Sequence, residues 1–182
     1  DVEFENAPVG AMQIVKTDKD SGNRLSGARF DIFSDAGLSD KYASIEIADP
    51  NGTELSNVPV GTYYFVETQA PAGYVLNATP VTATVSTGQT TVVELKNTKN
   101  TNIIWKKDSL TLKSLKGAEF DIFDAAQALK GHCVSDADGK IVLFGLPAGV
   151  YTAVETKAPE GYKMLTAPVS FEIVDGETRE YV

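Results

Sequence analysis

Two stretches in the first half of the chain recur in the second half at an almost constant distance. Residues 27–33 read Gly-Ala-Arg-Phe-Asp-Ile-Phe and return 90 positions later, at 117–123, as Gly-Ala-Glu-Phe-Asp-Ile-Phe. Residues 67–74 read Glu-Thr-Gln-Ala-Pro-Ala-Gly-Tyr and return 88 positions later, at 155–162, as Glu-Thr-Lys-Ala-Pro-Glu-Gly-Tyr. A repeat of about 90 residues has the size of a small domain. The chain is therefore expected to hold two copies of one domain in tandem.

Short alternating runs within each copy predict strands. Residues 62–66 (Thr-Tyr-Tyr-Phe-Val) and 81–85 (Val-Thr-Ala-Thr-Val) are rich in β-branched and aromatic residues, and Gly, Pro, Asn and Asp separate such runs. This rhythm is typical of an all-β sandwich. Only residues 38–47 and 125–130 have a composition that allows a helical turn or two.

The repeat also sets the expected domain limits. In the first copy, Asn97 ends the last expected strand and lies nine residues after Gly88. The same spacing counted from Gly176 in the second copy leads to position 185, beyond the last residue, Val182. The second domain is therefore expected to lack its final strand. The expected parts are a first domain at 10–97, a linker at 98–102 and a second domain at 103–182.

Composition excludes several classes of function. Sixteen Lys and Arg residues against 25 Asp and Glu give a net charge of −9, so a phosphate backbone is repelled and no nucleic-acid partner is expected. No apolar run approaches the roughly 18 to 20 residues of a membrane helix, so no membrane span is expected here, and a signal or anchor would lie outside this sequence. One Cys and one His cannot form a disulfide or a four-ligand zinc site, so no metal or other cofactor is expected.

His132 and Cys133 are adjacent, which suggests a thiol nucleophile with an imidazole base. Neighbouring side chains of an extended strand point to opposite faces, however, so the imidazole is badly placed to take the thiol proton. We interpret the two as one surface and one buried strand residue. A turnover enzyme is not expected.

Three polar residues of the first copy fall on apolar strand faces when side chains alternate with a period of two. They are Lys16 after Met12 and Ile14, Glu67 after Tyr63 and Phe65, and Asn97 after Val93 and Leu95. In the second copy, Lys106 and Glu155 occupy the corresponding places. Burying a lone ammonium or carboxylate is costly, so each group must be paired, neutralised or consumed in a reaction.

Two interpretations fit these inward-facing groups. The first is a buried Lys–Glu ion pair with the Asn hydrogen-bonded beside it, or strand-end side chains that reach solvent. The second is covalent, because burial favours a neutral amine beside a neutral carboxylic acid. The amine would attack the Asn side-chain Cγ while the protonated Glu donates to the Asn carbonyl and polarises it. Loss of ammonia would then leave a Lys–Asn isopeptide bond.

A longer pattern runs through both copies. It consists of Lys-x-Asp on the first strand, Gly-Ala-x-Phe, then Gly-x-Tyr-x-x-x-Glu-Thr-x-Ala-Pro-x-Gly-Tyr, and in the first copy a last strand that ends in Asn. This pattern resembles the CnaB (SpaA-type, prealbumin-like) domains of Gram-positive surface proteins and sortase-assembled pilins, and the Glu-Thr stretch is similar to the pilin E-box. The resemblance implies two tandem inverse-immunoglobulin β-sandwich domains. It also implies that Lys16 bonds to Asn97 with the help of Glu67, and that Lys106 and Glu155 are their counterparts.

The segment before the first copy has a pattern of its own. Residues 1–6 alternate so that Val2, Phe4 and Asn6 share a face, much as the last strand of the first copy does. Residues 1–9 are therefore expected to be the last strand of a preceding or relocated domain plus a linker. Asn6 is the expected acyl partner of Lys106, within the same chain or by head-to-tail strand donation between chains.

The function expected from these features is mechanical. The chain is expected to be a stalk or shaft segment of a Gram-positive adhesin or pilin, extracellular and anchored to the cell wall, with adjacent domains of the same fibre as partners. The alternative is a module that binds a host matrix protein such as collagen. Trp105, on the strand face opposite Lys106, is the suspected contact in that case, and otherwise would pack at the junction of the two domains.

Overall fold

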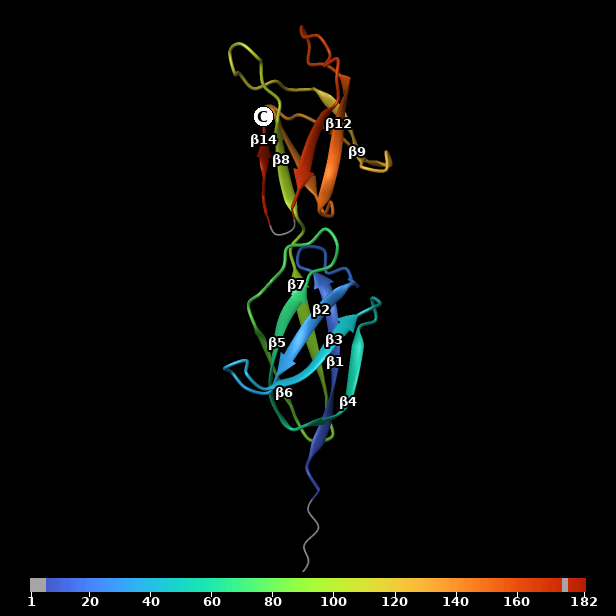
Figure 1. The fold of residues 1–182 in the computed structure, drawn as a ribbon, viewed down its shortest axis with the longest axis vertical. Coiled ribbons are helices and arrows are strands. Elements are labelled where there is room, and N and C mark those ends of the chain that lie inside the picture. The colour runs from blue at the N-terminus through green and yellow to red at the C-terminus, as the bar shows by residue number, and fades with distance from the viewer. Residues whose placement is uncertain (1–5, 175–176) are drawn as a thin grey trace, which may run out of the picture. The chain divides into compact units, whose positions relative to one another are not determined.

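The computed structural model describes residues 6–174 and 177–182, which form two compact units (Figure 1). The described part of the first unit comprises residues 6–71 and Leu76–Thr98, and the second comprises Ala72–Val75 and Lys99–Val182. Both units consist of strands and connecting loops, and the described residues contain no helix. The prediction of an all-β chain with two tandem sandwich domains is confirmed.

The first unit is built from seven strands in two sheets. One sheet has the order β4-β1-β7, in which β1 pairs antiparallel with β4 and parallel with β7. The other has the order β3-β2-β5-β6 and is antiparallel throughout. The strands are β1 (Val9–Asp18), β2 (Ala28–Phe33), β3 (Lys41–Ile47), β4 (Thr53–Pro59), β5 (Gly61–Gln69), β6 (Val81–Val85) and β7 (Thr90–Asn97).

The second unit repeats this plan strand for strand. Its sheets have the orders β11-β8-β14 and β10-β9-β12-β13, and β14 again runs parallel to the first strand. The strands are β8 (Thr101–Trp105), β9 (Glu119–Asp124), β10 (Leu129–Val134), β11 (Lys140–Phe144), β12 (Gly149–Lys157), β13 (Val169–Ile173) and β14 (Glu180–Tyr181).

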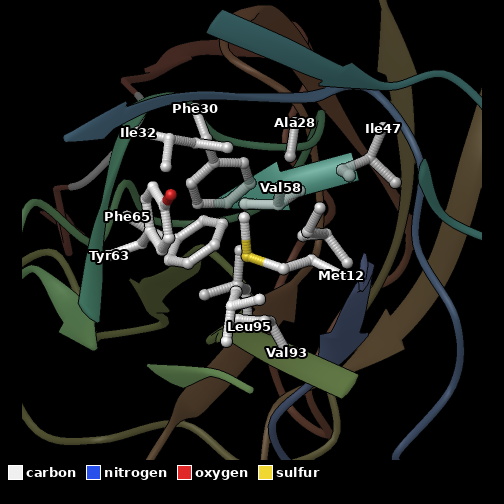
Figure 2. Close-up of a cluster of buried hydrophobic side chains, with 12 residues drawn as sticks. Met12, Ala28, Phe30, Ile32, Ile47, Val58, Tyr63, Phe65, Val93 and Leu95 are labelled. Atoms are coloured by element: carbon white, nitrogen blue, oxygen red, sulfur yellow. The ribbon is translucent and has the colours of Figure 1, made fainter. Parts of the chain in front are cut away.

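The interior of each unit is an apolar cluster contributed by both sheets. Figure 2 shows the first cluster, in which Met12 lies among Val58, Phe65 and Leu95. In the second unit, Phe120, Ile122 and Tyr151 are among the cluster's buried members. Burial of alternate side chains from both sheets is the main stabilising term of such a sandwich.

The expectation that residues 38–47 and 125–130 could hold a helical turn is wrong. Residues 41–47 form the edge strand β3, and residues 129–130 begin the edge strand β10. Leu38 and Gln127 adopt positive φ angles of 56° and 62°, which a right-handed helix does not contain. Pairing with β2 and β9 outweighs the weak local helix propensity, as tertiary context commonly does.

Two details of the second unit differ from expectation. Its first strand begins at Thr101, inside the expected linker at 98–102. Its final strand is also represented, because Glu180 and Tyr181 pair with Ile103 and Ile104. The expectation of a second domain without a final strand is corrected accordingly: β14 takes the place beside β8 that β7 has beside β1.

Candidate functional site

Lys16 and Asn97 lie on neighbouring parallel strands of one sheet. Lys16 of β1 is opposite Leu95 of β7, and Asp18 is opposite Asn97. Residues two apart share a face of a strand, so Asn97 lies on the same inner face as Lys16, one step further along. Both residues are buried, with 1% and 2% of their surface exposed. The structure therefore brings the expected nucleophile and acyl group to one interior face.

Glu67 reaches these two residues from the facing sheet. It lies on β5, opposite Phe30 of β2, and only 4% of its surface is exposed. Its Oε1 is 3.7 Å from Lys16 Nζ. Its Oε2 accepts a hydrogen bond of 2.8 Å from Asn97 Nδ2 and one of 2.7 Å from the backbone N–H of Asn77. One carboxyl group thus bridges the amine and the amide.

Burial changes the protonation of the lysine. It lowers the pKa of Lys16 to about 8, and the negative charge of Glu67 opposes this shift without cancelling it. About one Lys16 in ten is then neutral at pH 7, compared with about one in 3,000 for an exposed lysine. The cavity beside Lys16, Glu67 and Asn97 has a volume of only about 10 Å³, room for about one water. The amine is therefore activated in a confined, nearly dry site.

The hydrogen-bond arrangement differs from the one expected from sequence. We expected a protonated Glu67 to donate to the Asn97 carbonyl, whereas Asn97 donates its Nδ2–H to Glu67. The nitrogen that would leave as ammonia is therefore hydrogen-bonded to the Glu67 carboxyl group. A carboxyl group in this position can carry a proton between the Lys16 amine and the Asn97 amide nitrogen.

The second unit repeats half of this arrangement. Lys106 follows β8 directly, and its Nζ is 3.3 Å from Oε1 of Glu155 on β12. The backbone N–H of Leu165 donates to Oε2 of Glu155 over 2.6 Å, as Asn77 does to Glu67. The Lys106 side chain is 16% exposed, whereas that of Glu155 is fully buried. The expected Lys106–Glu155 pair is therefore present.

Asn6, the expected partner of Lys106, is exposed and lies outside any strand. Residues 1–5, which include the rest of the expected strand 1–6, lie outside the described residues. Asn6 and Lys106 also belong to different units. The pairing of Asn6 with Lys106 therefore stays a prediction.

The other candidate residues, His132, Cys133 and Trp105, each contact groups within the second unit. His132 Nδ1 is 2.8 Å from Asp121 Oδ1, whereas Cys133 Sγ donates to the carbonyl of Phe120. Burial raises the pKa of the Cys133 thiol to about 11, so the thiol stays protonated at neutral pH. Trp105 donates its Nε1–H to Glu180, and lysine ammonium groups at 107 and 140 each lie 5.9 Å from its ring centroid.

Sequence reasoning missed the backbone donors that hold the two carboxyl groups. The N–H groups of Asn77 and Leu165 come ten residues after Glu67 and Glu155, respectively. Any residue except proline has a backbone N–H, so the residue type does not identify such a donor. The spacing of ten residues from each Glu, which is the same in both copies, could have indicated these donors. Among the described residues, no group of three or more His, Cys, Asp or Glu side chains is suited to hold a metal ion. Those residues also contain no helix able to cross a membrane.

Comparison with known proteins gives two matches to one family model. The model of the SpaA prealbumin-like fold domain matches residues 10–99 and again residues 100–182. No curated protein matches the sequence.

Among solved structures, the Bacillus anthracis TIE protein is 34% identical, with a TM-score of 0.65 over 96% of this chain and 33% of that one. This chain thus spans a third of the length of that relative. A streptococcal ancillary pilin is 25% identical, with a TM-score of 0.45, over 98% of this chain and 62% of the pilin. The shaft pilin spaA from Lactobacillus rhamnosus GG is 19% identical, with a TM-score of 0.43, over 96% of each chain.

Proposed function

This chain belongs to the SpaA family of prealbumin-like fold domains, and we propose that it is a segment that carries mechanical force in a Gram-positive surface stalk or pilus, cross-linked by a Lys16–Asn97 isopeptide bond. The observation that carries the proposal is the single buried carboxyl group of Glu67, which contacts both the Lys16 amine and the Asn97 amide. A plain ion pair would not require the amide in this position.

The reaction needs no reagent from outside the chain. Neutral Lys16 Nζ attacks Asn97 Cγ, forming the Nζ–Cγ bond. Glu67 accepts the proton that the attacking nitrogen loses and delivers a proton to Nδ2. The Cγ–Nδ2 bond then breaks, and ammonia leaves. Because the protein itself is modified, the reaction occurs once per domain, and the chain is not a turnover enzyme.

The bond would join the first and last strands of the unit. A pulling force that enters along β1 and leaves along β7 would then pass through a covalent link, whereas otherwise it would load the backbone hydrogen bonds between the two strands. The surrounding core would be shielded from the force. This placement is what makes a stalk or shaft role preferable to a purely stabilising one.

Force spectroscopy of single molecules tests the proposed role. The wild-type first unit is expected to show no extension between residues 16 and 97, whereas Asn97→Ala should release about 80 residues, roughly 270 Å of chain. The second unit serves as the internal reference in both proteins. A wild-type first unit that releases the same length as the variant would contradict the proposal.

The setting that follows from this role is the outside of the cell. We place the chain on the cell wall, with neighbouring domains of the same fibre as its partners. Donation of a strand carrying Asn6 to Lys106 belongs to the same proposal, with the donated strand taking the place beside β8 that the two residues of β14 hold. Denaturing gels of the wild type and Lys106→Ala test it: a covalent ladder in the wild type alone supports donation between chains, and monomer in both lanes contradicts it.

The alternative role, binding of a host matrix protein, is separable by experiment. A matrix-binding module should bind immobilised collagen saturably, and Trp105→Ala should weaken that binding. A stalk segment should show no saturable binding. The Trp105 ring already has partners in its own domain, namely the ammonium groups of Lys107 and Lys140, each 5.9 Å from the ring centroid, and the Glu180 carboxylate.

A further inference from the structure

The second unit exposes a group of large apolar side chains at one of its ends. Two loops meet there, residues 106–118 after β8 and residues 158–168 after β12 (Figure 1). The Tyr162 hydroxyl donates to Asp108 Oδ2 over 2.8 Å and so joins the two loops. The exposed apolar side chains of these loops, which we call the apolar tip, are Leu110, Leu112, Tyr162, Met164 and Leu165.

Comparison with the first unit shows that the fold does not require the two leucines of the tip. The loop after β1 and the loop after β8 contain the same turn, closed by a backbone hydrogen bond from its fifth residue to its first, of 2.9 Å in one unit and 3.0 Å in the other. The two turns align Leu110 with Asp20 and Leu112 with Gly22. The second unit thus has leucine where the first has a charged residue and a glycine.

Leu112 occupies its place against the preference of its backbone. Its φ is 58°, in the left-handed region that glycine adopts easily and leucine rarely does, and Gly22 has a φ of 72° at the aligned position. Leu112 is 68% exposed and Leu110 is 91% exposed, so neither leucine gains burial within the unit in return. Backbone strain without a structural gain indicates a task outside the unit.

The tip is surrounded by positive charge in an acidic chain. Its two loops contain five lysines and only two acidic residues, Asp108 and Glu160, whereas the chain has a net charge of −9. Lys113, Lys116 and Lys163 are exposed and form no ion pair with a described residue. Asp108 accepts two backbone N–H groups of its own turn and a tyrosine hydroxyl, which hold its carboxylate within the turn. This end of the unit therefore attracts an anionic surface, although the chain as a whole repels one.

We propose that the apolar tip docks the second unit on the surface of a membrane that contains anionic phospholipid. The leucine and methionine side chains enter the boundary between headgroups and acyl chains, and the amphipathic ring of Tyr162 lies at the level of the headgroups. The lysines stay in water beside the lipid phosphates. The proposal rests on the tip alone and does not require the isopeptide bond of the first unit.

A bilayer suits this surface better than a protein partner does. Leu110 and Leu112 lie in a tight turn, where solvent surrounds their side chains. A protein partner would have to supply a closely fitting pocket for each of them, whereas a bilayer accepts separate apolar side chains without a matching shape. Lysines around exposed apolar side chains are also typical of segments that lie on anionic membranes.

Flotation of the intact chain with lipid vesicles tests the proposal. The probe is a vesicle of phosphatidylglycerol and phosphatidylcholine in equal parts, and a vesicle of phosphatidylcholine alone has the same apolar interior without the charge. Saturable binding to the anionic vesicles is expected, at least about tenfold tighter than to the neutral ones, because each lysine near an anionic surface contributes about fivefold. Raising the salt concentration from about 0.05 to 0.5 M should weaken this binding at least about tenfold.

Two variants test the two components of the surface. Leu110→Asp combined with Leu112→Gly gives the second unit the turn residues of the first, so the protein should fold and lose at least about nine-tenths of its vesicle-bound fraction. Lys113→Gln combined with Lys163→Gln keeps both leucines and should weaken binding to the anionic vesicles at least about tenfold. The lysine variant keeps the proposal testable if the turn variant does not fold.

Leu129→Asp is the matched control, because Leu129 is 59% exposed, lies on β10 outside both loops and undergoes the same change of charge. It should bind the anionic vesicles as the wild type does. No binding of the wild type to anionic vesicles, undiminished binding of the folded turn variant or of the lysine variant, or an equal loss in the control would overturn the proposal.

Sedimentation of the chain without vesicles distinguishes the lipid from a second copy of the chain. The wild type is expected to sediment as a monomer. Self-association that Leu110→Asp with Leu112→Gly abolishes, without any binding to vesicles, would assign the tip to a contact between copies and overturn the proposal.

Discussion

Replacement of Glu67 by Gln separates the two interpretations of the buried Lys16, Glu67 and Asn97. The amide is nearly isosteric with the carboxyl group, and its carbonyl oxygen can still accept the hydrogen bond from the backbone of Asn77. It cannot carry a proton from Lys16 to the leaving nitrogen, however. The variant should therefore fold but remain without the covalent bond.

The expected loss of stability follows from the length of chain that the bond closes. Lys16 and Asn97 are about 80 residues apart, and closing such a loop is worth roughly 4 to 5 kcal/mol in the chain-entropy treatment developed for disulfides. For a domain of this size, 1 kcal/mol corresponds to about 4 to 8 °C. The first unit of the Glu67→Gln protein should therefore unfold roughly 16 to 40 °C below that of the wild type.

Calorimetry combined with intact mass measurement reads out both effects. Glu54→Gln is the control, because Glu54 is an exposed residue of β4 and its substitution should change stability by no more than about 0.5 kcal/mol. A Glu67→Gln protein that still loses ammonia would refute the assigned proton transfer. A variant that lacks the bond but unfolds at the wild-type temperature would refute the loop-closure reasoning.

Three further perturbations follow from individual contacts. Because the Lys16 pKa is lowered to about 8, the rate of bond formation in freshly refolded protein should rise about tenfold per pH unit up to pH 7 and level off above pH 8. The rate is measured as the loss of mass with time after refolding. A rate that still rises at pH 10 would contradict the lowered pKa. The backbone N–H of Thr111 and, second to it, the Tyr162 hydroxyl, which donates over 2.8 Å, lower the pKa of Asp108 to about 2. Tyr162→Phe removes the second donor only, so an NMR titration should show this pKa rising part of the way towards 3.8, and an unchanged value would contradict the role of the hydroxyl. Gly52 and Gly88 both have positive φ, but only a Cβ at position 52 would collide with a backbone carbonyl of β1. In chemical denaturation, Gly52→Ala should therefore lower the free energy of unfolding of the first unit by about 1 to 3 kcal/mol more than Gly88→Ala does. Equal losses in the two variants would argue against the collision.

The sequence predicted the inner face of the site well, and the reason is the strict period of two in a strand. Lys16, Glu67 and Asn97 each continue an apolar alternation, and the structure buries all three. The same logic predicted one surface and one buried residue at His132 and Cys133, and the structure has His132 exposed and Cys133 half-buried. The internal repeat was as informative, because it transferred each assignment from one copy to the other.

Features that depend on three-dimensional contacts could not be predicted from the sequence. The direction of the Asn97–Glu67 hydrogen bond depends on which amide atom faces the carboxyl group, and no pattern of residue types encodes it. The helical turn expected near Leu38 was wrong, because pairing between β2 and β3 decides the conformation there. The exposure of Leu110 and Leu112 could not be predicted either, because apolar residues of a loop give no sign of whether the folded chain buries them.

The mass of the intact, denatured protein tests the central claim most directly. A Lys16–Asn97 bond removes one molecule of ammonia, so the wild type should be lighter than its sequence by that amount, and a digest should contain the branched peptide that joins β1 to β7. Lys16→Met should restore the full mass, since it removes the nucleophile and leaves the acyl group in place. A wild-type mass equal to that of the unmodified sequence would contradict the covalent account and leave Lys16 and Glu67 as a buried ion pair.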